Sequence, residues 1–339
     1  MPATPSAPAT PSAPATPPAP ATPSAPATPP ATQAMDDLVV VSNRGPLSFG
    51  LDDEGRPEPA GTGGGLAATV HPLLTGSGAT WVSAAMSEGD RRAAAEGLMT
   101  EEGLRLVTVQ PDPGAYRMAY DVVSNATLWF CHHHLWDLPR RPKFDRHWRE
   151  AWDAYRAVNH VFAEVAAEVA PERARVLVQD YHLSLVGKML AEMRPDLRTV
   201  HFSHTPFADP GVLRALPSFA AGELLAGMAG FGACGFHSGR WEASFRAAYE
   251  DRALAAEAAS AGARFGEPPR TFVAPLGPDP AAIAGEAGSP EVAAARSKIA
   301  ARVGARKLIV RVDRVELSKN ILRGLWAFEE LLEMQPEWR

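Results

Sequence analysis

The chain has 339 residues, with 33 lysines and arginines against 39 aspartates and glutamates, and its formal net charge is −6. This mildly acidic balance argues against nucleic acid or an anionic membrane as the main partner, because both attract basic surfaces. Two cysteines are too few for a disulfide framework, so a reducing compartment fits, and no run of 18 apolar residues is present to span a bilayer. We therefore expect a cytoplasmic protein that binds neither nucleic acid nor membrane.

Residues 1–34 differ in composition from the rest of the chain. They repeat the units ATPSAP and ATPPAP without a charged or aromatic residue, and residues 1–30 hold 12 of the 32 prolines. Such a segment has nothing to bury, so it favours polyproline II or disorder, and it lacks the basic start and apolar stretch of a secretion signal. We expect a disordered tail, with a proline-rich ligand for a partner domain as the alternative role. About 300 residues remain, enough for a sizeable core.

Nine short runs rich in apolar and β-branched residues predict strands in the remaining chain. The first, Leu38–Pro46, is an apolar run of four that ends in a polar loop. The other eight runs are Thr80–Ala85, Leu104–Val109, Ala126–His133, Arg175–Asp180, Arg198–His204, Ala233–Ser238, Thr271–Gly277 and Lys307–Asp313.

Helical patterns lie between many of these runs. Residues 147–169 place four aromatic side chains near one face, at spacings of four, three and seven residues: Trp148, Trp152, Tyr155 and Phe162. Further helices are expected over Leu183–Met193, Phe219–Met228, Glu242–Ala261 and Ile321–Met334. Because strands that alternate with helices form mostly parallel sheets covered on both faces, the sequence predicts an α/β fold.

Polar residues follow several of the predicted strands directly. They are Ser42-Asn43-Arg44, Asp180-Tyr181-His182, His204-Thr205-Pro206 and Asp313-Arg314. Parallel sheets place their ligands at the carboxyl edge, where these residues would gather. The recurrence of the pattern indicates an enzyme or a ligand-binding protein.

Two loops carry groups suited to phosphate. Gly61–Gly65 precedes a helical pattern, so its backbone N–H groups and the helix N-terminus would cradle an anion, with a flexible turn as the alternative. Arg314 and Lys319 lie five residues apart in one loop and would both face a diphosphate, stabilising a leaving group without a metal. A solvated charged loop is the alternative for that pair.

Asp180 and His204 are candidates for direct contact with a substrate. A carboxylate at the end of a strand accepts hydrogen bonds from sugar hydroxyls or acts as a base, and the alternative is a cap for the following helix. His204 would donate a hydrogen bond to a substrate oxygen, although a lone histidine is more often structural. The run Cys131–His134 suggests metal ligands, but consecutive residues of a strand point to opposite faces, so we expect no metal site there.

Taken together, these motifs resemble glycosyltransferase family 20, the retaining trehalose-6-phosphate synthases of GT-B fold. The matching pieces occur in the family's order across residues 38–339: VVVSNRGP, GGGLAATVHPLL, SNATLWFCHH, a W-x-x-Y-x-x-V-N run, VQDYHL, HFSHTPF, GFHS, APLG and VDRVELSK. The resemblance implies Rossmann-like domains and transfer of glucose from UDP-glucose, or a related nucleotide sugar, to glucose 6-phosphate. It also implies a retained anomeric configuration, no covalent enzyme intermediate, and no cofactor or metal.

The resemblance implies four residues on the acceptor side. Arg44 would contact the acceptor phosphate, and Tyr120 and Trp129 would line the pocket with it. Asp180 would hold acceptor hydroxyls.

Four further residues are implied on the donor side. Gly65 would give its N–H near the bond that breaks, and His204 would contact the donor glucose. Arg314 and Lys319 would bind the diphosphate. The catalytic set would be Asp180, His204, Arg314 and Lys319.

The chain also departs from the family pattern. The family loop usually reads D-R-L-D-Y-[ST]-K-G, whereas Asn320 stands at the glycine position here, which alters the close approach to a diphosphate. We expect residues 35–285 to form the acceptor domain and 286–339 to begin an incomplete nucleotide-sugar domain, so that the chain alone has weak or no activity. Two alternative functions stay open: a sister synthase that uses another phosphorylated acceptor, of glucosylglycerol-phosphate or cyclitol-phosphate type, and a non-catalytic sugar-phosphate-binding regulator. Besides the two small-molecule substrates, a second copy of the chain, in a homo-oligomer, is an open option as a partner.

Overall fold

The computed structural model describes residues 35–62, 65–101, 103–135, 143–262, 269–277 and 280–338. The tail expected over residues 1–34 lies outside these ranges. The chain divides into two units, Met1–Gln33 and Ala34–Arg339, and every element below belongs to the second.

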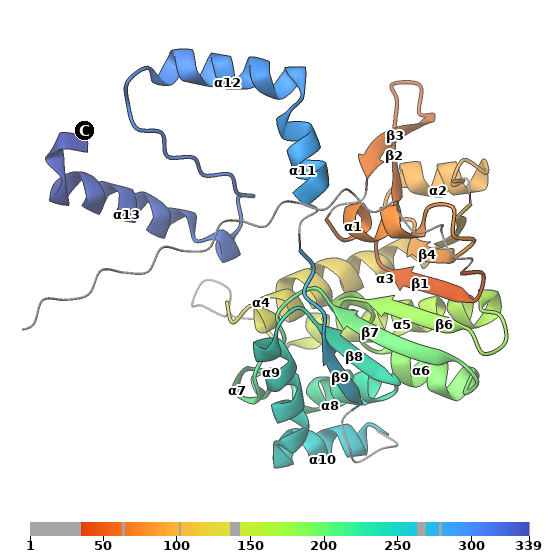
Figure 1. The fold of residues 1–339 in the computed structure, drawn as a ribbon. Helices are drawn as coiled ribbons and strands as arrows, with labels where there is room; N and C mark the ends of the chain where they lie inside the picture. The colour runs from red at the N-terminus through yellow and green to blue at the C-terminus, as the bar shows by residue number, and fades with distance from the viewer. Residues whose placement is uncertain are drawn as a thin grey trace, which may run out of the picture. The chain divides into compact units, whose positions relative to one another are not determined.

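A parallel sheet forms the centre of the described chain (Figure 1). Its seven strands have the order β5-β4-β1-β6-β7-β8-β9, and every neighbouring pair is parallel. They are β1 (Leu38–Ser42), β4 (Thr80–Ala84), β5 (Arg105–Val109), β6 (Arg175–Gln179), β7 (Arg198–Ser203), β8 (Ala233–Phe236) and β9 (Arg270–Val273). The order reverses between β1 and β6, and such a switch point opens a crevice at the carboxyl ends of the two strands.

Helices cover both faces of the sheet, as predicted. Successive side chains of β1 point to opposite faces, so Val39 and Val41 join the larger core while Val40 joins a smaller one. On the larger side lie α5 (Arg146–Val169), α6 (Val186–Met193) and α8 (Ser218–Ala229). Leu74 of α1 (Gly65–Leu74) packs on the smaller side.

The long helix α5 confirms the predicted aromatic face. Asp145 caps its N-terminus by accepting a hydrogen bond from the Trp148 backbone N–H at 3.0 Å. All four predicted aromatic side chains of the helix are buried. Tyr155 also donates its hydroxyl proton to the backbone oxygen of Tyr181 at 2.6 Å, so α5 fixes the loop that follows β6.

The strand predicted over Ala126–His133 is wrong. Residues there belong to a π-helix, η1 (Met118–Leu128), and to α4 (Trp129–His132). The helices bury Val123, Leu128 and Cys131 in the same core as α5. The error has a simple reason, since a short apolar run reads the same in a buried helix as in a buried strand.

The strand predicted over Lys307–Asp313 is also wrong. No described strand lies beside this segment to pair with it, and Val310 and Val312 are 69% and 89% exposed. The helix predicted over Ile321–Met334 is present as α13, with the bounds expected. The remaining elements of this part are α11 (Pro280–Ala287), α12 (Pro290–Val303), η4 (Leu317–Lys319) and η5 (Pro336–Trp338).

Two predicted helices are each divided in two. Glu242–Ala261 forms α9 (Gly239–Glu250) and α10 (Arg252–Ser260), because Asp251 between them caps the second helix through two backbone N–H groups. Leu183–Met193 forms the single turn η3 (Tyr181–Leu183) and then α6. The helix predicted over Phe219–Met228 is confirmed by α8.

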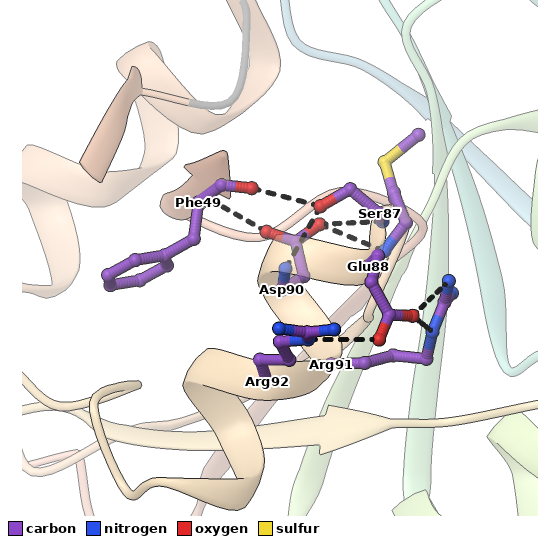
Figure 2. A network of polar contacts seen from close by, with 7 residues as sticks. Phe49, Ser87, Glu88, Asp90, Arg91 and Arg92 are labelled. Atoms are coloured by element: carbon purple, nitrogen blue, oxygen red, sulfur yellow. Dashed lines mark hydrogen bonds and ion pairs between the residues drawn. The ribbon is translucent and has the colours of Figure 1, made fainter. Parts of the chain in front are cut away.

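An antiparallel hairpin that was not predicted precedes the glycine loop and is formed by β2 (Leu47–Leu51) and β3 (Pro57–Thr62). Figure 2 shows what holds β2 to helix α2 (Glu88–Ala95). The buried Asp90 carboxylate accepts hydrogen bonds from the backbone N–H groups of Phe49, Met86 and Ser87 at 2.8 to 3.0 Å. Two short helices, α3 (Pro113–Arg117) and α7 (Pro210–Leu213), complete the described elements.

None of the helices in the described ranges combines the length and apolar character needed to cross a bilayer.

Candidate functional site

Four strands that lie side by side end in polar side chains. Arg44 follows β1, Asp180 follows β6, His204 follows β7 and His237 follows β8. Because neighbouring parallel strands end at the same edge, the topology brings these groups to one side of the sheet. The first two flank the switch point between β1 and β6.

Asp180 has a strained backbone and a shielded carboxyl group. Its φ of 67° and ψ of 169° lie in a region that non-glycine residues rarely adopt. Its Oδ1 accepts hydrogen bonds from the backbone N–H of His204 at 3.2 Å and from the N–H and hydroxyl of Thr205, each at 3.3 Å. Burial nevertheless raises the pKa of Asp180 to about 6, and these hydrogen bonds act against that rise.

Arg44 presents a charge to solvent at the end of β1. Its side chain is exposed and makes no hydrogen bond or ion pair with another residue in the described ranges. The next residue, Gly45, is packed so closely that a Cβ atom there would lie 2.4 Å from Ser83 Oγ. The preceding residue, Asn43, accepts a hydrogen bond from the Tyr116 hydroxyl at 2.9 Å. The backbone on both sides of Arg44 is therefore fixed while its guanidinium is free to bind an anion.

A stack of aromatic rings runs beside this cation. Tyr116 stacks on Tyr120 at 5.8 Å between ring centroids, Tyr120 stacks on His182 at 5.7 Å, and His182 stacks on Tyr181 at 4.1 Å. Burial, together with the charge of Arg44, lowers the pKa of His182 to about 3. The stack thus places neutral, mostly buried rings next to a positive charge.

His204 lies between two hydrogen-bonding partners. Its Nε2 is 2.9 Å from Gln179 Oε1, and its Nδ1 is 3.3 Å from Nε2 of His237. Burial, with the neighbouring His237 and His201, lowers the pKa of His204 to about 4. His204 is therefore neutral near neutral pH and suited to hydrogen bonding.

Trp129 and Gly65 occupy helix ends. Trp129 begins α4, is half-buried, and lies 4.1 Å from the His133 ring between centroids. Gly65 is the first residue of α1, so its N–H belongs to the helix N-terminus, where anions are favoured. Gly63 and Gly64 of the predicted cradle lie outside the described residues.

Arg314 and Lys319 both pair with an acid in their own loop. The distance from Arg314 Nη2 to Glu316 Oε1 is 3.6 Å, and that from Lys319 Nζ to the same oxygen is 3.2 Å. These cations share one counter-ion, and within the described ranges they make no hydrogen bond to Arg44, Asp180 or His204. The structure brings the sheet-edge residues together, and the loop of this pair lies near them. Arg314 acts electrostatically on Tyr181 and Lys319 acts on His133. Glu316 and Leu317 line one pocket with Trp129 and Phe130.

The reasoning about Cys131–His134 started from a strand that does not exist. Residues 129–132 are helical, His133 Nδ1 bonds the Trp129 backbone oxygen at 2.7 Å, and His132 Nδ1 accepts from the Ala208 N–H at 3.2 Å. Across the described part of the chain, no three histidine, cysteine, aspartate or glutamate side chains gather as a group that would hold a metal ion.

Three features of this edge were not anticipated from the sequence: the role of His237, the ring stack, and the bond from Tyr116 to Asn43. His237 lies in the GFHS motif at the end of a predicted strand, so the same strand-end rule would have found it. The other two depend on Tyr116 of α3 and Tyr120 of η1, which lie in a segment for which no helix was predicted.

Comparisons with a family model and with known proteins point to the same family. The model of glycosyltransferase family 20 matches residues 36–339. A trehalose-6-phosphate synthase of Mycolicibacterium vanbaalenii is 34% identical over 311 residues, which cover 88% of this chain and 61% of that protein. The chain thus spans about three fifths of the length of this curated relative.

Solved structures agree on the fold. The α,α-trehalose-phosphate synthase (UDP-forming) of Burkholderia xenovorans, in complex with glucose-6-phosphate, superposes with a TM-score of 0.69 at 25% identity, over 89% of this chain and 63% of that one. The corresponding enzyme of Burkholderia vietnamiensis gives a TM-score of 0.66 at 26% identity, over 89% and 62%. The predicted α/β architecture is therefore confirmed.

Proposed function

Because the chain belongs to glycosyltransferase family 20, we propose that it takes part in transfer of glucose from UDP-glucose, or another nucleotide diphosphate glucose, to glucose 6-phosphate, giving trehalose 6-phosphate. One observation supports this proposal most strongly. Arg44, Asp180 and His204 follow the ends of three adjacent strands at the switch point of a Rossmann-like sheet, where such folds bind nucleotides and sugars.

On the acceptor side, the proposal gives Arg44 the phosphate of glucose 6-phosphate. A guanidinium without a counter-ion in the described ranges forms strong charged hydrogen bonds with phosphate. Tyr120 and Trp129 would line the sugar, and stacking on His182 holds the Tyr120 ring in place. Asp180, ionised above about pH 6, would accept hydrogen bonds from sugar hydroxyls.

On the donor side, His204 would contact the glucose, and the Gly65 N–H at the start of α1 would face the bond that breaks. Arg314 and Lys319 would neutralise the diphosphate, so the proposal needs no metal ion for this charge. Binding of the diphosphate would then replace Glu316 as the partner of both cations.

The proposed chemistry is a front-face displacement. The bond between glucose C1 and the diphosphate oxygen breaks, and a bond from C1 to the acceptor hydroxyl oxygen forms on the same face. The hydroxyl proton passes to the departing phosphate oxygen, so the configuration is retained without a covalent enzyme intermediate. The similarity to a UDP-forming synthase and to a synthase that binds glucose-6-phosphate supports this assignment.

The test begins with binding, measured separately for each substrate by titration calorimetry. We expect glucose 6-phosphate to bind more tightly than glucose, and UDP-glucose to bind at a second, independent site. Mass spectrometry and NMR of the product formed from both substrates then check for α,α-trehalose 6-phosphate. Acceptor binding without any donor binding, even in a chain extended at its C-terminus, would favour the regulator. Turnover with a different phosphorylated acceptor alone would favour a sister synthase.

A further inference from the structure

The side chains of His204 and His237 belong to one continuous chain of hydrogen bonds. The Leu276 backbone N–H lies 3.3 Å from His237 Nδ1, and His237 Nε2 lies 3.3 Å from His204 Nδ1. His204 Nε2 in turn lies 2.9 Å from Gln179 Oε1. The chain thus begins at a backbone amide, a group that only donates.

This amide sets the direction of every other bond in the chain. A ring nitrogen that accepts a hydrogen bond carries no proton, so neutral His237 holds its proton on Nε2. That proton points at His204 Nδ1, which must accept it, and neutral His204 therefore holds its own proton on Nε2. A reversed Gln179 amide would set two donors against each other, so its carbonyl oxygen faces His204.

Both rings favour the neutral form that this chain requires. A second proton on His204 would set two N–H groups against each other across its 3.3 Å contact with His237, and a second proton on His237 would face the Leu276 N–H, also at 3.3 Å. Burial lowers the pKa of His204 to about 4 and also lowers the pKa of His237, although the Ala274 carbonyl acts against the latter shift. The other groups beside His204 include the Asp180 carboxylate, which accepts from the His204 backbone N–H at 3.2 Å, the Phe202 ring, at 5.0 Å between centroids, and His201, which is neutral by burial.

We propose that His237 is a positioning residue that holds His204 in the Nε2-protonated tautomer, so that His204 presents a hydrogen-bond donor to the sugar of the nucleotide substrate. The choice of ligand rests on the proposed function. Gln179 Oε1 marks the acceptor position that a sugar hydroxyl oxygen would take. His237 would not touch the substrate, and it would act through His204 alone.

The chain of hydrogen bonds also connects the tautomer of His204 to the segment after β9. Ala274 N–H donates to the Phe236 backbone oxygen at 2.9 Å, which fixes this segment beside the end of β8. Leu276 N–H then reaches His237. The protonation pattern of His204 therefore depends on backbone placed more than 70 residues along the chain, which a sequence motif around His204 does not contain.

The test reads the tautomers directly, on the full chain with ¹⁵N-labelled histidine. Long-range ¹H–¹⁵N spectra at about pH 7 show which ring nitrogen of each neutral histidine carries the proton. His237→Gln keeps a side-chain N–H that reaches His204 Nδ1, whereas His237→Leu has a similar size and no donor. His160→Gln changes an exposed histidine of α5 and is the matched control.

We expect wild type, His237→Gln and His160→Gln to show His204 protonated on Nε2. In His237→Leu, both tautomers of His204 should appear, its pKa should rise towards the ordinary value, and UDP-glucose affinity should fall about fivefold to tenfold while glucose 6-phosphate affinity stays the same. A proton on Nδ1 in wild type, or a leucine variant that retains the wild-type pattern, overturns the positioning role. UDP-glucose that leaves the His204 Nε2 signal unmoved, with the tautomers as expected, refutes the proposed function instead.

Discussion

Asp180 is expected to lower the stability of the folded chain at neutral pH, where its carboxylate is ionised and able to accept hydrogen bonds from a sugar. Burial raises its pKa from the ordinary 3.8 to about 6, so the folded chain binds this proton more tightly than the unfolded chain. For an acid with a raised pKa in the folded state, the stabilisation is complete below 3.8 and is lost as pH rises through about 6. Each pKa unit corresponds to about 1.4 kcal/mol, so the ionised carboxylate lowers the free energy of unfolding by about 3 kcal/mol at neutral pH.

Asp180→Asn removes this charge with little change in shape. The amide oxygen still accepts from the backbone N–H groups of His204 and Thr205. The Tyr181 N–H, which also favours the carboxylate, would face the amide nitrogen, and losing one such hydrogen bond costs about 1 kcal/mol. The variant should therefore be about 2 kcal/mol more stable than wild type at about pH 7 and no more stable at about pH 4.

Urea unfolding at both pH values, followed by tryptophan fluorescence, measures this difference. The matched control is Asp145→Asn at the N-cap of α5, where asparagine and aspartate are equally good caps, so it should leave the free energy of unfolding nearly unchanged at about pH 7. The reasoning is refuted if Asp180→Asn is less stable than wild type at about pH 7, or if its advantage is the same at both pH values.

Three further predictions concern the neighbouring elements. Arg44→Ala should weaken binding of glucose 6-phosphate by roughly 10-fold to 100-fold, the effect of one or two charged hydrogen bonds, and calorimetry should show glucose binding unchanged. Gly45→Ala should lower the free energy of unfolding by about 1–3 kcal/mol, because its Cβ would lie 2.4 Å from Ser83 Oγ, and Ser83→Ala in the same chain should recover part of the loss in urea. Asp90→Ala should cost about 3 kcal/mol in urea, since it leaves the Phe49 N–H and two N–H groups at the start of α2 without their acceptor.

Each of these has a result that contradicts it. Equal loss of glucose and glucose 6-phosphate affinity in Arg44→Ala would mean that the site collapsed and that phosphate was not its target. A double variant of Gly45 and Ser83 no more stable than Gly45→Ala would locate the clash elsewhere. For Asp90, the control is Asp90→Asn, which keeps one acceptor oxygen and should cost less than Asp90→Ala; equal costs would argue against the hydrogen bonds as the cause.

The strands and their common edge were predictable because each has a local cause. Leu38–Val41 is buried on both faces, so this run is apolar at every position. The same rule found the strands that end at Asp180 and His204. It failed at Ala126–His133 because an apolar run of that length packs equally well as a helix against α5.

The failure at Lys307–Asp313 has a different cause. A strand is stable only when a neighbour completes its hydrogen bonds, and no described strand lies beside this segment. In the site, the residues at the strand ends were predictable, but their backbone conformation and the direction of their hydrogen bonds were not. The positive φ of Asp180 has no signal in the sequence, and the direction of the bonds around His204 depends on a segment distant in the sequence, the loop at Leu276.

A strained backbone, a buried carboxylate and a cation unpaired within the described ranges lie together at the switch point between β1 and β6. A positive and a negative group side by side suit a ligand that has both phosphate and hydroxyl groups. Asp180 carries a backbone conformation that costs about 1–3 kcal/mol and a carboxylate whose charge is disfavoured by burial. An ion pair with Arg44 would lower the pKa of Asp180, yet that pKa is raised, and within the described ranges the two side chains do not pair. A fold shaped for stability alone would bring these opposite charges together. Keeping them apart leaves the cation available for a phosphate and the carboxylate for hydroxyls, which are the two kinds of group that glucose 6-phosphate carries.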